Sequence, residues 1–312
     1  MSETPPSVAP RMPSAPAQVL PEGACDTHNH VFGPFERFPL VYPPPFPLPL
    51  APAAVHRRML AEGGLGRAVL VQPVYYGFDH SALMDALAQD TGRLRGIGVA
   101  SPDVSDQTLE VMDRAGVRGL RFSEARNPDG TSRAGAVGLD QLAPLAERLR
   151  ALDWQAHVWA SAADLDRYLP ALDRFDLPLV IDHLGMVDCD AGTGASSFQR
   201  LLGLVREGRA WVKLSLCRVP GAGPRYEAAR PFHDALVEAN PDRLLWASDW
   251  PFIRLGDQSP DVGALLDRFQ AWIGDAAMSR KILADNPARL FGFGPPGLDA
   301  PGEDYKTQRA SL

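Results

Sequence analysis

Two closely spaced histidines carry the first chemical signal in this chain. His28 and His30 stand two positions apart at the end of a short apolar run that begins at Ala24. Residues two apart on a β-strand share a face, so both imidazoles can offer a nitrogen to one ion. Neutral imidazole is a common ligand of zinc and other transition metals. The spacing therefore predicts a metal chelate.

Three further residues that can bind a metal or exchange a proton lie near the ends of other apolar runs. They are His157, His183 and Asp249, in a chain that holds only 7 histidines. A catalytic zinc typically takes about three protein ligands and keeps one position for water. We therefore expect one divalent ion, zinc or manganese. Its predicted ligands are His28, His30, His157 and Asp249.

Asp249 and His183 are the predicted catalytic residues. A bound metal would lower the pKa of its water, and Asp249 would then take the proton. Asp182 directly precedes His183 and is suited to orient its imidazole. For His157 a second interpretation stays open, that of a satisfied core histidine beside Trp159.

Arginines near strand ends suggest an acidic substrate. Their planar guanidinium groups bind carboxylates through paired hydrogen bonds. Arg126 and Arg218 could equally be solvated loop charges, whereas Arg121 lies within an apolar run. Neutral donors following the second apolar run could add hydrogen bonds. The predicted substrate contacts are Arg121, Arg126, Arg218, Gln72 and Tyr76.

The elements that must position these groups alternate regularly. Eight short runs rich in branched residues are separated by stretches of helical period. The runs are Ala24–His28, Ala68–Gln72, Gly96–Ala100, Val117–Phe122, Gln155–Trp159, Leu179–His183, Trp211–Ser215 and Leu244–Asp249.

This alternation predicts an α/β fold of parallel strands joined by right-handed crossovers. Eight units in about 250 residues match a closed (β/α)8 TIM barrel, in which active sites lie at the carboxyl ends of the strands. An open doubly wound sheet is the main alternative. It is disfavoured because 26–30 reads Asp-Thr-His-Asn-His where a glycine-rich phosphate turn would follow the first strand.

The ends of the chain differ in composition from its centre. We expect residues 1–20, rich in proline and alanine, to form a disordered arm, residues 21–293 to form the barrel, and residues 294–312 to form a polar tail. The segment 32–52 interleaves prolines with aromatic residues. We expect it to pack over another part of the molecule.

Charge and composition exclude several classes of function. The net charge of −7 argues against general binding of nucleic acid, and no apolar run approaches the roughly 18 residues of a membrane helix. The 3 scattered cysteines do not form a disulfide framework, so a cytoplasmic location is expected. The predicted partner is a small acidic molecule, and both a monomer and a homo-oligomer are compatible with the sequence.

Four motifs follow one another along the chain. They are Cys-Asp-Thr-His-Asn-His-Val-Phe-Gly-Pro at 25–34, Ile-Asp-His-Leu-Gly at 181–185, Trp-Ala-Ser-Asp-Trp-Pro at 246–251 and Asp-Asn-Pro-Ala-Arg-Leu-Phe at 285–291. Together they resemble the amidohydrolase superfamily, in particular its branch of 2-pyrone-4,6-dicarboxylate lactonase and sugar-acid lactonases. The resemblance implies a barrel hydrolase that opens cyclic esters. It also implies that Asp249 activates water and that Arg121 and Arg218 bind substrate carboxylates.

The chain departs from the pyrone-dicarboxylate lactonase pattern at two positions. Met186 stands where that pattern has arginine, and Phe252 stands where it has histidine. Relatives differ in their need for a metal, so the resemblance leaves metal-free catalysis open. We therefore expect hydrolysis of a small carboxylated lactone that is pyrone-dicarboxylate-like, muconolactone-like or derived from a sugar acid.

Two rival functions remain at this point. One is a metal-dependent, non-oxidative decarboxylase of an unsaturated or aromatic acid, which relatives with a similar His and Asp set would support. The other is a barrel that binds an acidic ligand without turning it over. Loss of carbon dioxide would identify the first, whereas uptake of water identifies hydrolysis.

Overall fold

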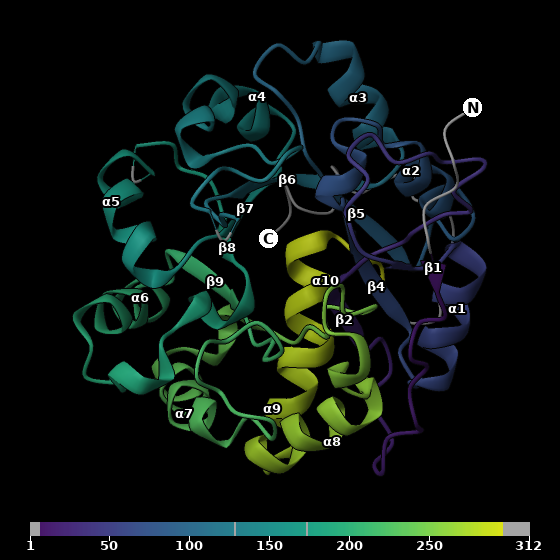
Figure 1. The fold of residues 1–312 in the computed structure, drawn as a ribbon. Coiled ribbons are helices and arrows are strands. Elements are labelled where there is room, and N and C mark those ends of the chain that lie inside the picture. The colour runs from purple at the N-terminus through teal and green to yellow at the C-terminus, as the bar shows by residue number, and fades with distance from the viewer. Residues whose placement is uncertain (1–6, 128, 173, 296–312) are drawn as a thin grey trace.

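A parallel barrel forms the centre of the molecule. The structure is a computed structural model that describes residues 7–127, 129–172 and 174–295. Within these residues eight parallel strands pair in the order β10-β9-β8-β7-β6-β5-β4-β2, as the TIM barrel prediction requires (Figure 1). The strands are β2 (Cys25–Asn29), β4 (Arg67–Val71), β5 (Leu94–Gly98), β6 (Val117–Ser123), β7 (Gln155–Trp159), β8 (Leu179–Ile181), β9 (Ala210–Lys213) and β10 (Leu244–Leu245).

Helices follow the strands and cover the outside of the barrel (Figure 1). Local sequence explains some of their ends, for example at Ser105, whose side chain accepts a hydrogen bond from the Thr108 backbone and caps α3. The helices are α1 (Ala53–Glu62), α2 (Ser81–Ala88), α3 (Asp106–Arg114), α4 (Ala146–Ala151), α5 (Ala162–Leu172), α6 (Ser196–Arg206), α7 (Arg230–Ala239), α8 (Val262–Ile273), α9 (Ala276–Arg280) and α10 (Asn286–Phe291).

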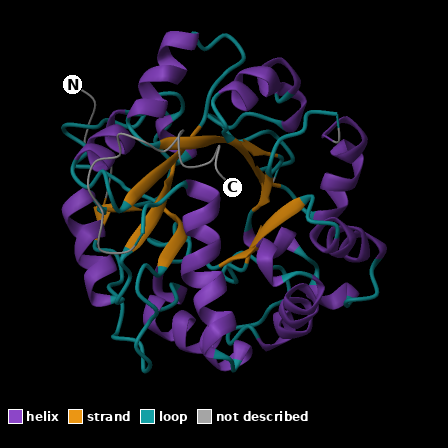
Figure 2. Ribbon diagram, turned by 180° about the vertical axis from the view of Figure 1, so that it is seen from behind, coloured by secondary structure: helices purple, strands orange, loops and turns teal. Residues whose placement is uncertain are grey.

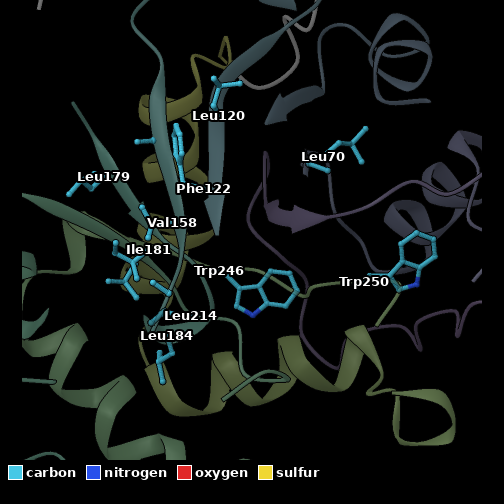
Figure 3. Close-up of a cluster of buried hydrophobic side chains, with 14 of the residues drawn as sticks. Leu70, Leu120, Phe122, Val158, Leu179, Ile181, Leu184, Leu214, Trp246 and Trp250 are labelled. Carbon is cyan, nitrogen blue, oxygen red and sulfur yellow. The ribbon is translucent and has the colours of Figure 1, made fainter. Parts of the chain in front are cut away.

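Alternation along each strand separates the core from the interior of the barrel. On β6, Leu120 and Phe122 are fully buried, and Phe122 pairs in register with Val158 of β7 (Figure 3). Arg121 lies between them and therefore points to the opposite face. The apolar residues pack in the main hydrophobic cluster, which leaves the inward face for the arginine.

Backbone hydrogen bonds between β2, the first strand of the barrel, and the segment after β10 close the barrel. The Thr27 amide donates to the Trp246 carbonyl over 3.1 Å, and the Asp249 amide donates to the His28 carbonyl over 2.8 Å. The His30 amide donates in turn to the Trp250 carbonyl over 2.9 Å. An open sheet would lack these bonds. Closure therefore seats Asp249 directly beside the His28–His30 pair.

The C-terminal helix covers the opposite end of the barrel and was not among the predicted elements. Figure 2 shows it crossing the strands from behind. Phe291 of α10 is fully buried in a cluster that includes Cys25 and Val180 from inside the barrel. Three side chains from the amino ends of strands donate to carbonyl groups at and just after its end: Gln155 to Leu290, Arg95 to Phe291 and Gly292, and Arg67 to Gly294.

The prediction of disorder for residues 1–20 is wrong over the part that the structure describes. Ser7–Val8 forms strand β1 and pairs in parallel with β3 (Leu48–Pro49). Further along, the Arg11 carbonyl accepts a hydrogen bond of 2.8 Å from the Trp250 indole, and Asp261 accepts from the Ser14 amide. The composition offers little to bury, but carboxylates and an indole on the barrel satisfy the backbone of this segment. Residues 1–6 of the arm and 296–312 of the tail lie outside the described residues.

The aromatic, proline-rich segment 32–52 packs against the barrel, as expected. Phe32 and Phe35 are buried, and the Tyr42 amide donates to the Tyr75 carbonyl over 2.9 Å. Its Phe46 contacts Tyr75 at 6.1 Å between ring centroids. In the described part of the chain, no helix combines the length and apolar character needed to cross a bilayer.

We predict that Phe291→Ala lowers the free energy of unfolding by about 3–5 kcal/mol, because it empties the packed end of the barrel. Urea denaturation followed by far-ultraviolet circular dichroism measures this change. Phe78→Ala is the matched control, since Phe78 is 51% exposed and its truncation should cost far less. Equal losses for the two variants would contradict the packing role of α10.

Candidate active site

A cavity that is partly open to solvent lies at the carboxyl ends of the strands, where a barrel of this type carries its functional groups. Its lining combines predicted site residues with several that sequence reasoning did not find. The lining residues are His30, Pro73, Val74, Tyr75, Arg121, Arg133, Trp159, His183, Arg218, Asp249, Ile253 and Arg254.

The predicted pair of histidines meets Asp249 at the floor of this cavity. His30 Nδ1 lies 2.7 Å from the Val71 carbonyl oxygen, which can only accept, so Nδ1 carries the proton. The other nitrogen, Nε2, therefore presents a lone pair in neutral His30. It lies 3.3 Å from Asp249 Oδ1.

His28 repeats this arrangement with a carboxylate in place of the carbonyl. Its Nδ1 lies 3.1 Å from Asp182 Oδ1 and 3.2 Å from Lys213 Nζ. Lys213 can donate to Asp182 at 3.0 Å, and a proton on His28 Nδ1 then donates to the same carboxylate. The Nε2 atom is buried, has no hydrogen-bond partner in the described part of the chain, and lies 3.6 Å from Asp249 Oδ1. Burial lowers the pKa of His28 well below its usual value, so the ring is neutral. Two imidazole lone pairs thus converge on one carboxylate oxygen.

Asp249 is ionised although it is buried. Burial alone would raise its pKa, but the Arg218 guanidinium, at 2.7 Å from Oδ2, and the neighbouring histidines hold the pKa of the carboxyl well below its usual range. Its backbone has a φ of 70°, in the left-handed region. Such strain in a non-glycine residue is typical of functional sites, where the surrounding fold enforces it.

A buried network of charges lies beneath the histidines. Asp182 is contacted by Lys213 Nζ at 3.0 Å and by Arg121 Nε at 2.9 Å. Burial opposes its ionisation, yet Lys213, His28 and Arg121 hold the pKa of Asp182 well below its usual value. Lys213 was absent from the sequence prediction because a lysine in an apolar strand gives no motif. Its position next to Asp182 follows from the pairing of β9 with β8.

His183 is neutral and accepts rather than donates on its cavity side. Burial lowers its pKa to about 4. Its Nδ1 lies 2.7 Å from Ser215 Oγ, and its Nε2 lies 3.5 Å from Arg121 Nη2, which can only donate. The proton of the neutral ring therefore belongs on Nδ1.

The structure does not bring His157 to the other predicted ligands. Among the described residues, the groups able to hold a metal are His28, His30 and Asp249, and His28, Asp182 and His183. Within the residues that the structure describes, neither ring nitrogen of His157 has a hydrogen-bond partner. The ring packs 5.9 Å from Phe291 near the closed end of the barrel. Trp159, two residues later on the same strand face, occupies the cavity wall instead.

Three predicted substrate contacts have other roles in the structure. Gln72 donates to the carbonyls of Gly77 and Asp79, and the Tyr76 hydroxyl accepts from the Gly33 amide over 2.8 Å. Arg126 contacts Gly130 and Ser132 on the exposed surface. Arg121 and Arg218 line the cavity, and their contact with a substrate stays a prediction. Arg133 and Arg254 were missed because they lie in loops beyond the strand ends.

Known proteins resemble this chain along nearly its whole length. The amidohydrolase family matches residues 25–293. The 4-sulfomuconolactone hydrolase of Rhizobium radiobacter is 36% identical over 292 residues, which cover 92% of this chain and 96% of that protein. The 2-pyrone-4,6-dicarboxylate hydrolase of Comamonas testosteroni is 33% identical over 290 residues, covering 89% and 93% of the two chains.

A solved structure agrees with these sequence matches. It is a Pseudomonas putida protein proposed to be a 2-pyrone-4,6-dicarboxylic acid hydrolase. It is 33% identical, superposes with a TM-score of 0.73 and covers 88% of this chain and 99% of its own. The barrel, the histidine pair with its aspartate, and these matches agree. The chain belongs to the amidohydrolase family.

Proposed function

We propose that this protein hydrolyses a small carboxylated lactone. The observation that carries the proposal is the ionised, buried Asp249, which faces a cavity lined by four arginines. A carboxylate in this position can take a proton from water, while guanidinium groups attract an acidic substrate. The two curated relatives support the reaction class, since both are named as hydrolases of carboxylated or sulfonated lactones.

The donor set at the cavity floor fits a divalent metal ion. His28 Nε2, His30 Nε2 and Asp249 Oδ1 are three acceptors that face one another, and His28 Nε2 has no hydrogen-bond partner among the described residues. Such an arrangement is repulsive unless a cation lies among the three atoms. We propose that these residues hold zinc or manganese. When bound, the ion lowers the pKa of water and polarises a carbonyl oxygen.

The remaining chemistry follows from the side chains of this chain. Asp249 accepts the proton of the attacking water as the new carbon–oxygen bond forms, and Arg218 keeps the carboxylate oriented. His183 Nε2 accepts from Arg121 and orients its guanidinium group, but it cannot itself donate a hydrogen bond to the substrate. Arg121 therefore donates towards the negative charge that develops on the carbonyl oxygen of the lactone. The ring carbon–oxygen bond then breaks, and Asp249 returns the proton to the leaving oxygen. Ionisation of the new carboxylic acid releases one proton.

The cytoplasmic location stays a prediction from the sequence, which is compatible with both a monomer and a homo-oligomer.

The decarboxylation alternative has a distinct product, because it would release carbon dioxide and consume no water.

We expect Asp249→Asn to lower kcat on the order of 10²–10⁴-fold, since an amide cannot accept the proton of water. The assay follows ring opening of 2-pyrone-4,6-dicarboxylate and of 4-sulfomuconolactone by absorbance, with proton release and carbon dioxide measured in parallel. Asp129→Asn, on the exposed loop after β6, is the control and should retain the wild-type rate. A normal rate for Asp249→Asn would remove this residue from the mechanism.

Metal affinity provides an independent measurement. Chelator-treated protein is titrated with Zn²⁺ or Mn²⁺ against a chromophoric competitor. His30→Asn should weaken binding by more than the roughly 10–100-fold that loss of a ligand's supporting contact costs.

His157→Leu is the matched comparison within the same barrel. It should bind the metal like the wild type and unfold at an equal or higher urea concentration, because it removes two unpaired buried nitrogens. Loss of metal binding in His157→Leu would instead make His157 a ligand, as the sequence suggested.

A further inference from the structure

The four arginines that line the cavity form two groups, of which one is paired with carboxylates of the protein and the other is not. Arg121 pairs with Asp182 and Arg218 pairs with Asp249, so each of these arginines already faces a carboxylate of the protein. Arg133 and Arg254 line the same cavity, and neither forms an ion pair with a carboxylate in residues 7–127, 129–172 and 174–295. The cavity therefore carries two positive charges that the described chain does not neutralise.

Arg133 is held in place by its surroundings rather than by an ion pair. Its guanidinium lies 4.5 Å from the centre of the Trp159 ring, which Arg121 also contacts at 4.7 Å. The loop that carries Arg133 packs closely on the neighbouring loop after β4. At Gly135, with φ of 76°, a Cβ atom would collide with the Val74 carbonyl oxygen. Close packing thus fixes the approach of this loop to the cavity.

Arg254 reaches the same cavity from the last loop of the barrel. Its guanidinium lies 5.2 Å from the centre of the Phe46 ring, at the exposed rim. Its backbone φ is 71°, and Asp249 and Phe252 in the same loop are also left-handed. Three left-handed residues within six positions wind this loop tightly, so that Asp249 and Arg254 both face the cavity.

The two cations are close enough to affect one another. Burial lowers the pKa of Arg133 to about 10, and the charge of Arg254 is the next largest cause. Like charges that approach in a partly buried cavity are unfavourable unless an anion lies between them. A purely structural arginine would be expected to pair with a protein carboxylate or a ring of carbonyl groups. The side chain of Arg133 has instead one long bond of 3.4 Å to the Arg126 carbonyl and its contact with an indole.

We infer that Arg133 and Arg254 form a binding site for a second anionic substituent of the substrate, a carboxylate or a sulfonate. This inference rests on the proposed lactone hydrolysis and narrows it to lactones with two anionic groups. Arg218, which contacts Asp249 through Nε, keeps its other N–H groups for the first anionic group. The second group is bound at the side of the cavity formed by Trp159, Arg133 and Arg254, where Phe46 contacts Arg254 at the rim.

Kinetics with a pair of lactones test the assignment. 4-Sulfomuconolactone and muconolactone differ by one anionic group. Arg133→Gln should raise KM for 4-sulfomuconolactone about 10- to 100-fold, as expected for a lost charge-assisted hydrogen bond, with kcat little changed. Arg254→Gln should raise the same KM only a few-fold, because this side chain is exposed. The KM for muconolactone should stay within about twofold in both variants.

Arg126→Gln is the matched control, because Arg126 lies on the same loop as Arg133 but outside the cavity lining. It should leave both KM values unchanged. An equal rise of KM for both lactones in Arg133→Gln, or no rise for either, would overturn the inference. In that case, a requirement for Asp249 would still leave the proposed hydrolysis standing.

A binding measurement without turnover separates the two claims. Calorimetry compares benzene-1,3-dicarboxylate with benzoate as unreactive ring acids. The wild type should bind the dicarboxylate more tightly, and Arg133→Gln should abolish that difference while Arg126→Gln retains it. If the wild type opens neither lactone, this selective loss still supports the second anion site. No preference for the dicarboxylate in the wild type contradicts it.

Discussion

The backbone pairing of β2 with the segment after β10 is the constraint on which the active site depends. It sets the Asp249 amide on the His28 carbonyl and the His30 amide on the Trp250 carbonyl. The side chains between these bonds are then forced together, although they present three acceptor atoms to one another. Without the rest of the fold, these three side chains would move apart. The closed barrel maintains it, which is how a rigid scaffold keeps a site ready for a cation or a proton.

Charged residues beneath and beside the site fix the protonation states of its side chains. Asp182 orients His28, while Lys213 and Arg121 keep Asp182 ionised in a fully buried position. Arg218 does the same for Asp249 from the side. Each buried carboxylate therefore has a cationic partner, which offsets the cost of removing both charges from water. The site thus has two layers, an upper one that meets the substrate and a lower one that determines protonation.

The loops give this chain its particular cavity. Met186 and Phe252 stand where the pyrone-dicarboxylate lactonase pattern has polar groups, and Phe252 is 1% exposed in the core. Positive charge enters the cavity instead from Arg133 and Arg254. Trp159, Tyr75 and Phe46 supply flat apolar surfaces between these charges. A protein of net charge −7 thereby concentrates positive charge at one opening, which draws small anions to it.

The sequence by itself determined the eight strands, the helices between them, and the meeting of His28, His30, His183 and Asp249. These follow from periodicity and from the rule that parallel strands end at one face, both of which are local or topological properties. Only the tertiary structure decided which inward-facing residue of a strand lies at the mouth of the barrel. Residues two positions apart on a strand face inward alike, so the sequence pattern does not distinguish them. That register separated Trp159 from His157 and brought Lys213 under His28. It likewise took closure and loop packing to order residues 7–20 and to bring Arg133 and Arg254 together, because those contacts join segments that are distant in the sequence.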